Sequence, residues 1–241
     1  MMAFQIGAYE FRPRLWPSLA TVFFFVLTLF LGNWQSHRAE YKRSLQARYD
    51  QGQSAEPIHL GGVLQDKESL LFRKVEVQGE FDERGQILID NRVVNGVAGY
   101  HVLSPLHIVG SSFHVLVNRG WVPATADRNQ LPAIPRLSGT VRIVGIAVDP
   151  VSRYFEFAGA EPRNGVWQNL NFDRYRQVFA KPLQPVLIQQ TSDTKDGLYR
   201  EWPRPDAGVA THVSYAIQWF GLASTLVVLY VVLNFKKRVQ S

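Results

Sequence analysis

The sequence contains no cysteine among its 241 residues. A disulfide framework, a zinc site with cysteine ligands and a thiol nucleophile are therefore excluded, as is a copper chaperone that works through paired thiols. Charged residues are also scarce, at 19%, whereas 46% of the residues are hydrophobic. This balance excludes a disordered chain and provides enough apolar material for one sizeable core.

The motifs of common enzyme classes are absent too. There is no glycine-rich phosphate loop, no G-x-S-x-G nucleophile elbow and no H-E-x-x-H metal motif. Ser112 and His114 are close in sequence, but no third group can be assigned to orient them for nucleophilic catalysis. We therefore expect a surface hairpin at this point and a protein that is not an enzyme.

The net charge of +6 and the pI of about 9.6 suggest an acidic partner. Nucleic-acid binding is not expected, because the basic residues are spread along the chain and are not clustered with stacking aromatics. The tightest basic run, Lys236-Lys237-Arg238, directly follows an apolar segment. It is best explained as a membrane flank beside anionic head groups, so the lipid bilayer is the expected partner.

The first long apolar run covers residues 15–34 and contains no charge. About 20 residues are enough for a helix to cross the hydrocarbon core of a bilayer. Arg12 and Arg14 precede the run, and Trp16 and Trp34 lie at its two ends as interfacial anchors. A cleaved signal peptide is the alternative, but no small-x-small cleavage site follows. An uncleaved membrane anchor is therefore predicted.

A second apolar run, residues 212–235, ends at the basic run described above. Two spans place both chain ends on one side, and the flanking basic residues indicate the cytoplasm. Arg38, Lys42, Arg43 and Arg48 follow the first span on the predicted outer side, but a long domain translocates largely regardless of such charge.

The predicted chain therefore has five parts. These are a cytoplasmic segment (1–14), the first span (15–34), a periplasmic β-rich domain (35–211), the second span (212–235) and a cytoplasmic basic tail (236–241). The first span is expected to continue out of the membrane as a charged helix over residues 35–49.

Short segments with alternating apolar residues dominate between the spans. Strands are expected at residues 72–81, 86–92, 100–109, 113–122, 140–148 and 184–190. Residues 82–85 should form a hairpin turn, and Pro105 should mark a sheet edge or a bend. A short helix is expected at 171–180 with Asn171 as its N-cap. The pattern predicts an α+β membrane protein whose domain is a mainly antiparallel sheet or small barrel.

Three histidines, His101, His107 and His114, lie on neighbouring predicted strands, where their imidazoles could converge on a metal. No carboxylate occurs between Asp90 and Asp127 to serve as a further ligand or to support one. We therefore expect these histidines to face solvent and not to bind a metal.

Arg119 falls on an apolar strand face in the alternation 113, 115, 117, 119, 121. A half-buried guanidinium must be paired or hydrogen-bonded. The favoured explanation is a stacked pair with Trp121, fixed by a carboxylate such as Asp90. The alternative is a site for an anionic ligand or partner.

His212 opens the second span, near the outer interface. Neutral imidazole is the commonest protein ligand of haem iron, and Tyr215, Ala216 and Trp219 follow at helical spacing as a surface for a flat macrocycle. The alternative is an interfacial histidine that anchors the helix, with the aromatics as part of the membrane belt, and the residues alone favour it. Gln218 needs a partner in lipid and is expected to bond to the first span.

Several of these segments together resemble the Surf1 family. Gly32-Asn33-Trp34-Gln35 with Arg38 is similar to the family's Gly-x-Trp-Gln-x-x-Arg signature, and residues 115–123 (VLVNRGWVP) are the most specific match. His212, Tyr215, Ala216 and Trp219 are similar to the family's His-x-x-Tyr-Ala-x-x-Trp entry into the second span. Weaker matches lie at 72–75, 79–81, 91–92, 99–100 and 167–170, whereas Ala210-Thr211 replaces an Asn-rich run found in many members. The resemblance covers nearly the whole chain.

The resemblance implies a role in assembling haem–copper cytochrome c oxidase in the inner membrane of a bacterium. Members are understood to bind haem a and help to deliver it to oxidase subunit I, which makes subunit I and the haem a synthesis machinery the expected partners. His212 would be the iron ligand, with Tyr215 and Trp219 against the macrocycle and Arg38 or Arg204 near the propionates. The competing class is a membrane-anchored scaffold that holds an oxidase intermediate and does not bind haem.

Overall fold

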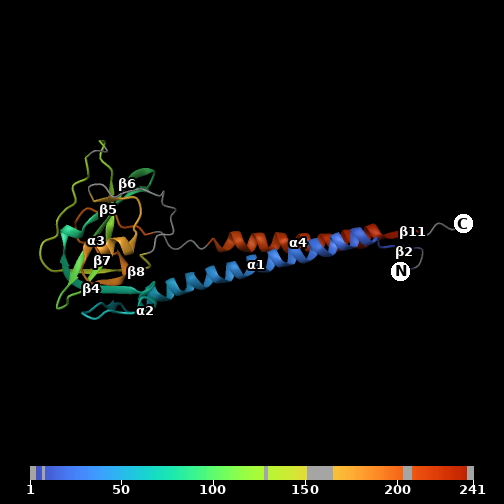
Figure 1. Ribbon diagram of the computed structural model, residues 1–241, viewed down its shortest axis with the longest axis horizontal. Helices are drawn as coiled ribbons and strands as arrows, with labels where there is room; N and C mark the ends of the chain where they lie inside the picture. Colours follow the sequence, from blue (N-terminus) through green and yellow to red (C-terminus); the bar gives the residue numbers. More distant parts are fainter. Residues whose placement is uncertain (1–3, 7–8, 128–129, 151–164, 203–207, 238–241) are drawn as a thin grey trace. The chain divides into compact units, whose positions relative to one another are not determined.

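The computed structural model describes residues 4–6, 9–127, 130–150, 165–202 and 208–237 (Figure 1). The chain divides into two compact units. One contains the two ends of the chain, Met1–Ala47 and Pro205–Ser241, and the other contains Arg48–Arg204.

Two long helices, α1 (Leu15–Ser54) and α4 (Val209–Asn234), dominate the first unit. Each contains an 18-residue window of mean hydropathy 2.0, of which only 11% is buried. Apolar helices of this length with exposed surfaces are suited to lipid and not to a soluble core. Pro17 lies in the first turn of α1, where its missing N–H costs no hydrogen bond. Because α1 continues unbroken to Ser54, the charged helix predicted over residues 35–49 is confirmed.

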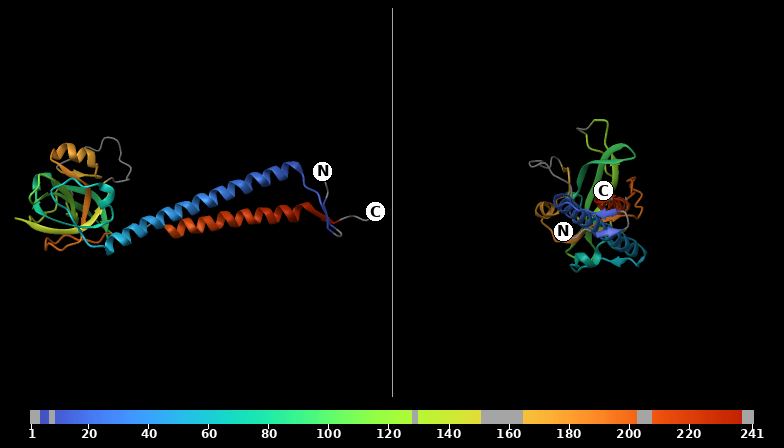
Figure 2. Two further views of the ribbon diagram at one scale, coloured as in Figure 1. Left: turned by 90° about the horizontal axis from the view of Figure 1, so that it is seen from below. Right: turned by 90° about the vertical axis from the view of Figure 1, so that its right-hand side faces the viewer.

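The chain segments that precede α1 and follow α4 form a small antiparallel sheet. β1 (Phe4–Ile6) pairs with β2 (Tyr9–Phe11), which pairs with β11 (Phe235–Lys237). The Arg12 N–H also donates to the carbonyl of Asn234 at 2.9 Å. Figure 2 shows β2 and β11 together at one end of the helix pair. The sequence analysis missed this sheet, because three-residue strands contain too few alternations to be recognised.

α1 and α4 contact each other along a seam of small and polar residues. On α1 the partly or fully buried positions recur every three or four residues at Ser18, Thr21, Phe25, Thr28, Gly32, Gln35 and Ala39. On α4 they are His212, Ala216, Trp219, Ala223, Leu226 and Tyr230. This spacing is typical of two helices that cross at a small angle, and small residues allow membrane helices to approach closely.

Hydrogen bonds across the seam differ from the one predicted. The hydroxyls of Ser18 and Tyr230 lie 2.6 Å apart. Gln218, which was expected to bond to the first span, is exposed on the opposite side of α4 and has no hydrogen bond within the described residues. The prediction was wrong because Gln218 falls between the seam positions Ala216 and Trp219 in sequence but not on their helix face.

A closed five-stranded barrel forms the second unit. Its strands are β4 (Lys74–Phe81), β6 (Val97–Ile108), β7 (His114–Pro123), β8 (Val141–Val148) and β10 (Leu183–Gln190). They pair in the order β4–β8–β10–β7–β6, and β6 pairs with β4 to close the barrel. All pairs are antiparallel except β7–β10. Five strands closed in this way form a barrel of the OB type, and the predicted mainly antiparallel small barrel is confirmed.

Shorter elements complete this unit. They are β3 (Ile58–His59), α2 (Lys67–Leu70), the 3-10 turn η1 (Glu83–Gly85), β5 (Ile87–Val94), β9 (Val166–Trp167) and α3 (Phe172–Phe179). α3 matches the predicted helix, and the Asn171 side chain accepts a hydrogen bond from the Arg174 N–H at 3.0 Å as its N-cap.

The segment 82–85 is a corner and not the hairpin turn that was predicted. β4 and β5 do not pair with each other, because both pair with β6 at different points along its length. β5 pairs with β6 up to Leu103, and β4 pairs with it from Leu106. Pro105 lies between these two stretches, where its missing N–H removes no bond from either partner. On that side β6 has no strand partner at Pro105, so the predicted sheet edge is confirmed, whereas β6 itself runs unbroken from Val97 to Ile108.

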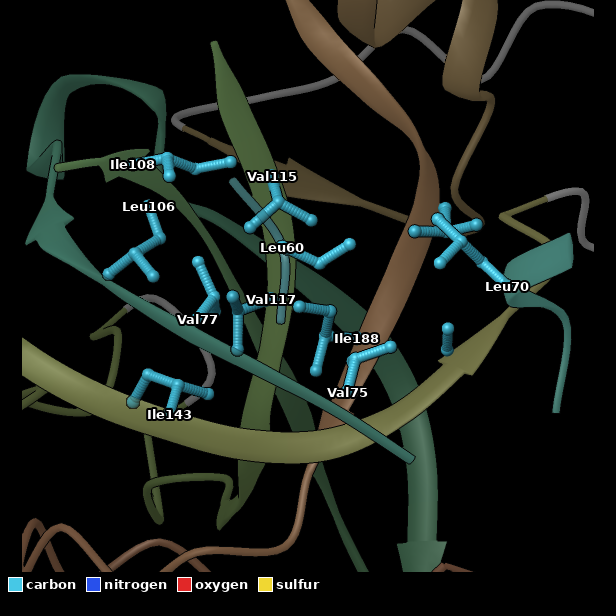
Figure 3. Packing of buried hydrophobic residues seen from close by; sticks show 12 residues of the cluster. Leu60, Leu70, Val75, Val77, Leu106, Ile108, Val115, Val117, Ile143 and Ile188 are labelled. Atoms are coloured by element: carbon cyan, nitrogen blue, oxygen red, sulfur yellow. The ribbon is translucent and has the colours of Figure 1, made fainter. Parts of the chain in front are cut away.

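The barrel interior is filled by branched aliphatic side chains. Figure 3 shows Val75, Val77, Val115, Val117 and Ile188, from the three strands β4, β7 and β10, pointing into this common space. Each of the five is at most 2% exposed. Alternate residues of the strands face outwards, where α3 covers a second cluster that includes Leu116, Trp167 and Tyr175.

Candidate functional site

His212 lies in the first turn of α4. Gly208 precedes the helix as its N-cap in the left-handed conformation, and its carbonyl accepts the His212 N–H at 3.3 Å. The imidazole points across the seam, so that its Nδ1 lies 2.7 Å from Oε1 of Gln35 on α1. With Nδ1–H donating to this oxygen, the lone pair of Nε2 is free to accept a bond. Within the described residues Nε2 has no hydrogen-bond partner.

The residues around His212 differ in how much of each side chain α1 covers. Ala216 and Trp219 lie in the seam, and Ala216 is 6% exposed. Tyr215 is 48% exposed and lies at the edge of the seam. Helical spacing places Tyr215, Ala216 and Trp219 on one sector of α4, and the packing of α1 covers part of that sector.

Basic residues of α1 lie near the His212 imidazole. Lys42 and Arg38 both act on it electrostatically. The guanidinium of Arg38 lies 5.4 Å from the centre of the Tyr41 ring, and it is exposed. Arg204, the other residue expected near an anionic group, lies outside the described residues.

Gln35 is a site residue that the sequence analysis did not single out. Its signal was present, because small or polar residues recur on α1 at positions 18, 21, 28, 32, 35 and 39. Such a pattern predicts the face that packs against another membrane helix. Because the two spans run antiparallel, Gln35 at the end of the first span lies at the same level as His212 at the start of the second.

A second polar cluster lies in the barrel unit, around Arg119. The Arg119 guanidinium lies 3.1 Å from the Asp196 carboxylate, and their side chains are 3% and 0% exposed. Its Nη2 donates to the carbonyl of Pro135 at 2.9 Å, and its centre lies 4.9 Å from that of the Phe81 ring. Arg200 binds the other oxygen of the same carboxylate.

Charge pairing determines the protonation of this cluster. Burial acts to raise the pKa of Asp196, but hydrogen bonds and charge from Arg200, together with Arg119, hold it below its ordinary value. Burial lowers the pKa of Arg119, although Asp196 opposes this effect. The cluster is an ion network that fixes the segment after β10 to the barrel, although the Nε atoms of Arg119 and Arg200 have no hydrogen-bond partner among the described residues.

Arg119 and Trp121 therefore do not form the stacked pair that was predicted, and Asp90 is not the partner. In the pairing of β6 with β7, Asn118 lies opposite Leu103 and Gly120 lies opposite Val102, so Arg119 is an extra residue in a β-bulge. A bulge reverses the alternation of faces that follows it. The Trp121 Nε1–H donates instead to the carbonyl of Arg92 at 2.7 Å.

The three strand histidines have separate surroundings. His101 contacts Asn118 and the ring of Trp202, and burial, followed by the charge of Arg92, lowers its pKa to about 4. His107 and His114 lie with their ring centres 4.8 Å apart. His114 is only 5% exposed, so the prediction that these histidines face solvent was wrong for it. In the part of the chain that the structure describes, no three metal-ligating side chains come together.

A cavity of about 590 Å³ lies beside α3, with Trp167 and Tyr175 among its lining residues. Its charged groups already have partners. Lys181 Nζ lies 2.6 Å from the Asp82 carboxylate. Although burial acts to raise it, hydrogen bonds from Lys181 and Arg84 lower the pKa of Asp82 to about 2. The polar part of the lining is therefore a structural ion pair between Lys181 and Asp82.

Two apolar helices with a closed barrel between them in the sequence define a membrane-anchored barrel protein. The model of the SURF1 family matches residues 22–224, and the chain belongs to this family. It is 27% identical over 223 residues to a SURF1-like protein of Monosiga brevicollis, covering 88% of this chain and 85% of the relative. It is 24% identical to a SURF1-like protein of Rickettsia felis (89% and 95% covered) and 25% identical to Surfeit locus protein 1 of Xenopus tropicalis (85% and 71%). The predicted family is confirmed.

Proposed function

We propose that the protein assists the assembly of haem–copper cytochrome c oxidase by binding haem a and helping to insert it into subunit I. Membership of the SURF1 family supports the assembly role. The contact between His212 and Gln35 supports the haem site, and it is the observation on which the proposal rests.

The side chains at the outer end of the helix pair fit a haem. A hydrogen bond to one ring nitrogen of a metal-binding histidine fixes the tautomer and orientation of the imidazole. Gln35 provides this bond at Nδ1, so Nε2 is the atom that would bind iron. When bound, the haem supplies an iron centre that accepts the imidazole lone pair.

Other residues would orient the cofactor. Trp219 presents an aromatic ring next to the small residue Ala216, and Tyr215 presents a second ring on the exposed side of α4. Arg38 and Lys42 are cations that pair with carboxylates such as propionates through charge-assisted bonds. Tyr215 and Arg38 are exposed, which supports an open site and suits a carrier that must release its cargo.

The proposed orientation places both chain ends in the cytoplasm and the barrel unit in the periplasm of a bacterial inner membrane. Arg12 and Arg14 on one end and Lys236 to Arg238 on the other support it, because cytoplasmic flanks are enriched in basic residues. Subunit I and the haem a synthesis machinery are the proposed partners. In this role the protein carries out no catalytic turnover.

The test is an absorption spectrum of the detergent-purified protein from cells that make haem a. We expect the wild-type protein to show a haem band and His212→Ala to lose it. Gln35→Leu should weaken the band, because the imidazole is no longer held. His37→Ala is the matched control, since His37 is exposed on α1 two residues from Gln35. A haem band of wild-type intensity in His212→Ala would show that His212 is not the iron ligand, whereas the absence of a haem band from the wild-type protein would favour the scaffold function.

A further inference from the structure

We infer that the helix pair carries a binding site for one anionic phospholipid, on the side of the seam opposite the His212–Gln35 contact. A groove of about 250 Å³ lies there between α1 and α4. It is lined by Ser36, Ala39, Arg43, Val213, Ala216, Ile217 and Phe220.

Small residues create the apolar part of this groove. Ala39 and Ala216, 1% and 6% exposed, form its floor, where larger side chains would fill it. The Phe220 ring packs over Gly32, where an added Cβ would lie 2.8 Å from it, and so closes the groove at this end. Phe220 and Ile217 are 40% and 67% exposed, so they form a wall that is open to the surrounding lipid. An acyl chain fits this apolar channel inside the membrane.

A cation marks the outer end of the groove. Arg43 lies eleven residues, about three helical turns, beyond Gly32 on α1. Its nearest acid is the Glu40 carboxylate at 3.5 Å, and both side chains are more than half exposed. Such an exposed ion pair contributes little to stability, so the guanidinium remains able to bind a phosphate.

The basic residues after the first span also need an explanation. Arg38, Lys42, Arg43 and Arg48 lie on the side of the membrane where topology does not call for positive charge. Juxtamembrane basic residues attract anionic lipids by about 1 kcal/mol each. Arg43 would bind the phosphate of a phospholipid, and the apolar groove beside it would hold an acyl chain of the same molecule.

The polar groups of this site differ from those of the proposed haem site, although Ala216 contributes to both. Val213 lines the groove, whereas the neighbouring His212 faces Gln35. Lipid binding is therefore expected in protein from cells that make no haem a. The failure of one proposal would not contradict the other.

Native mass spectrometry of the full-length protein in detergent tests the site. Protein from cells without haem a is titrated with phosphatidylglycerol and, separately, with phosphatidylcholine of the same acyl chains. We expect one phosphatidylglycerol to bind in preference to phosphatidylcholine, and Arg43→Gln to lower its affinity about fivefold. Arg48→Gln, which removes the same charge further along the same helix, should bind as the wild type, because Arg48 does not line the groove and lies 4.0 Å from the Glu68 carboxylate. Val213→Trp, which fills the groove, should lower the binding of both lipids.

Equal binding of the two lipids by the wild-type protein would overturn the proposal, because it would show unselective contact with the annulus. So would equal losses in Arg43→Gln and Arg48→Gln. Displacement of phosphatidylglycerol by excess inorganic phosphate would indicate an anion site without the groove and would also contradict it. If Val213→Trp does not fold, the Arg43→Gln comparison alone decides.

Discussion

Arg119 is a charged residue whose side chain is 3% exposed, and it is tolerated there because Asp196, Pro135 and Phe81 surround its guanidinium. Sequence reasoning recognised that this charge must have a partner, because a buried unpaired cation is costly. It could not identify Asp196, which lies 77 positions further along the chain. For His212 the residue type was informative, whereas the contact with Gln35 depends on how two distant helices pack.

Replacing Asp196 by asparagine should destabilise the barrel. Arg119 and Arg200 would then share a buried site without a counter-charge, and breaking a buried pair costs about 3–5 kcal/mol. Urea unfolding of the purified protein, followed by tryptophan fluorescence, measures this loss. Asp193→Asn is the control, because Asp193 is 79% exposed and lies 3.7 Å from Arg200. An Asp196→Asn midpoint equal to that of Asp193→Asn would show that the network is not needed for stability.

The buried imidazole of His101 should make stability depend on pH. Its pKa is about 4 in the folded protein, against an ordinary value of 6.5. The unfolded chain therefore binds the proton first, and stability is lost as the pH falls from 6.5 towards 4. His101→Gln should flatten this slope in thermal unfolding curves measured between pH 7 and pH 4. The His37→Gln variant, in which the replaced histidine is exposed on α1, should keep the wild-type slope, and an identical slope in both variants would contradict the assignment.

At the scale of elements, local patterns predicted most barrel strands but not the way they pair. Alternation located β4 and β10 because each has one face in the core. The barrel closes because β4 pairs with the end of β6. The sequence instead favoured a hairpin between β4 and β5, because these strands are neighbours along the chain and are joined by a short turn. The bulge at Arg119 was also not predictable, because the apolar alternation continues through it while the faces reverse.

The helix seam gives a prediction of its own. Gly32→Ile should separate α1 from α4, because any Cβ at Gly32 comes within 2.8 Å of Phe220. Overpacking of this kind costs about 1–3 kcal/mol, so the unfolding temperature in detergent should fall. Gly221→Ile is the matched control on α4, where an added Cβ meets nothing within 4 Å. Equal unfolding temperatures for the two variants would show that the seam does not hold the helices together.

At the scale of the whole molecule, the pairing of β2 with β11 joins the two chain ends. This pairing supports the proposed topology, in which the segments that flank the two spans lie on one side of the membrane. The two-span layout was predictable from hydropathy, because 18-residue windows of mean hydropathy 2.0 are long and strong signals. The small sheet was not, because its strands are three residues long.

Fusions to alkaline phosphatase test the orientation. The enzyme folds only outside the cytoplasm, so a fusion after Asp149 should be active and a fusion after Ser241 inactive. The expectation rests on the basic residues Arg12 and Arg14 and on Lys236 to Arg238. An inactive fusion after Asp149, with an active one after Ser241, would reverse the proposed topology.

The most direct test of the central claim is the haem a content of purified cytochrome c oxidase from cells that carry His212→Ala. His37→Ala serves as the control, and the membrane levels of both variants are matched by immunoblotting. Loss of the iron ligand should lower the haem a content of the oxidase in the His212→Ala strain and leave it unchanged in the His37→Ala strain. Oxidase with its full haem a content in the His212→Ala strain would contradict haem delivery through this histidine.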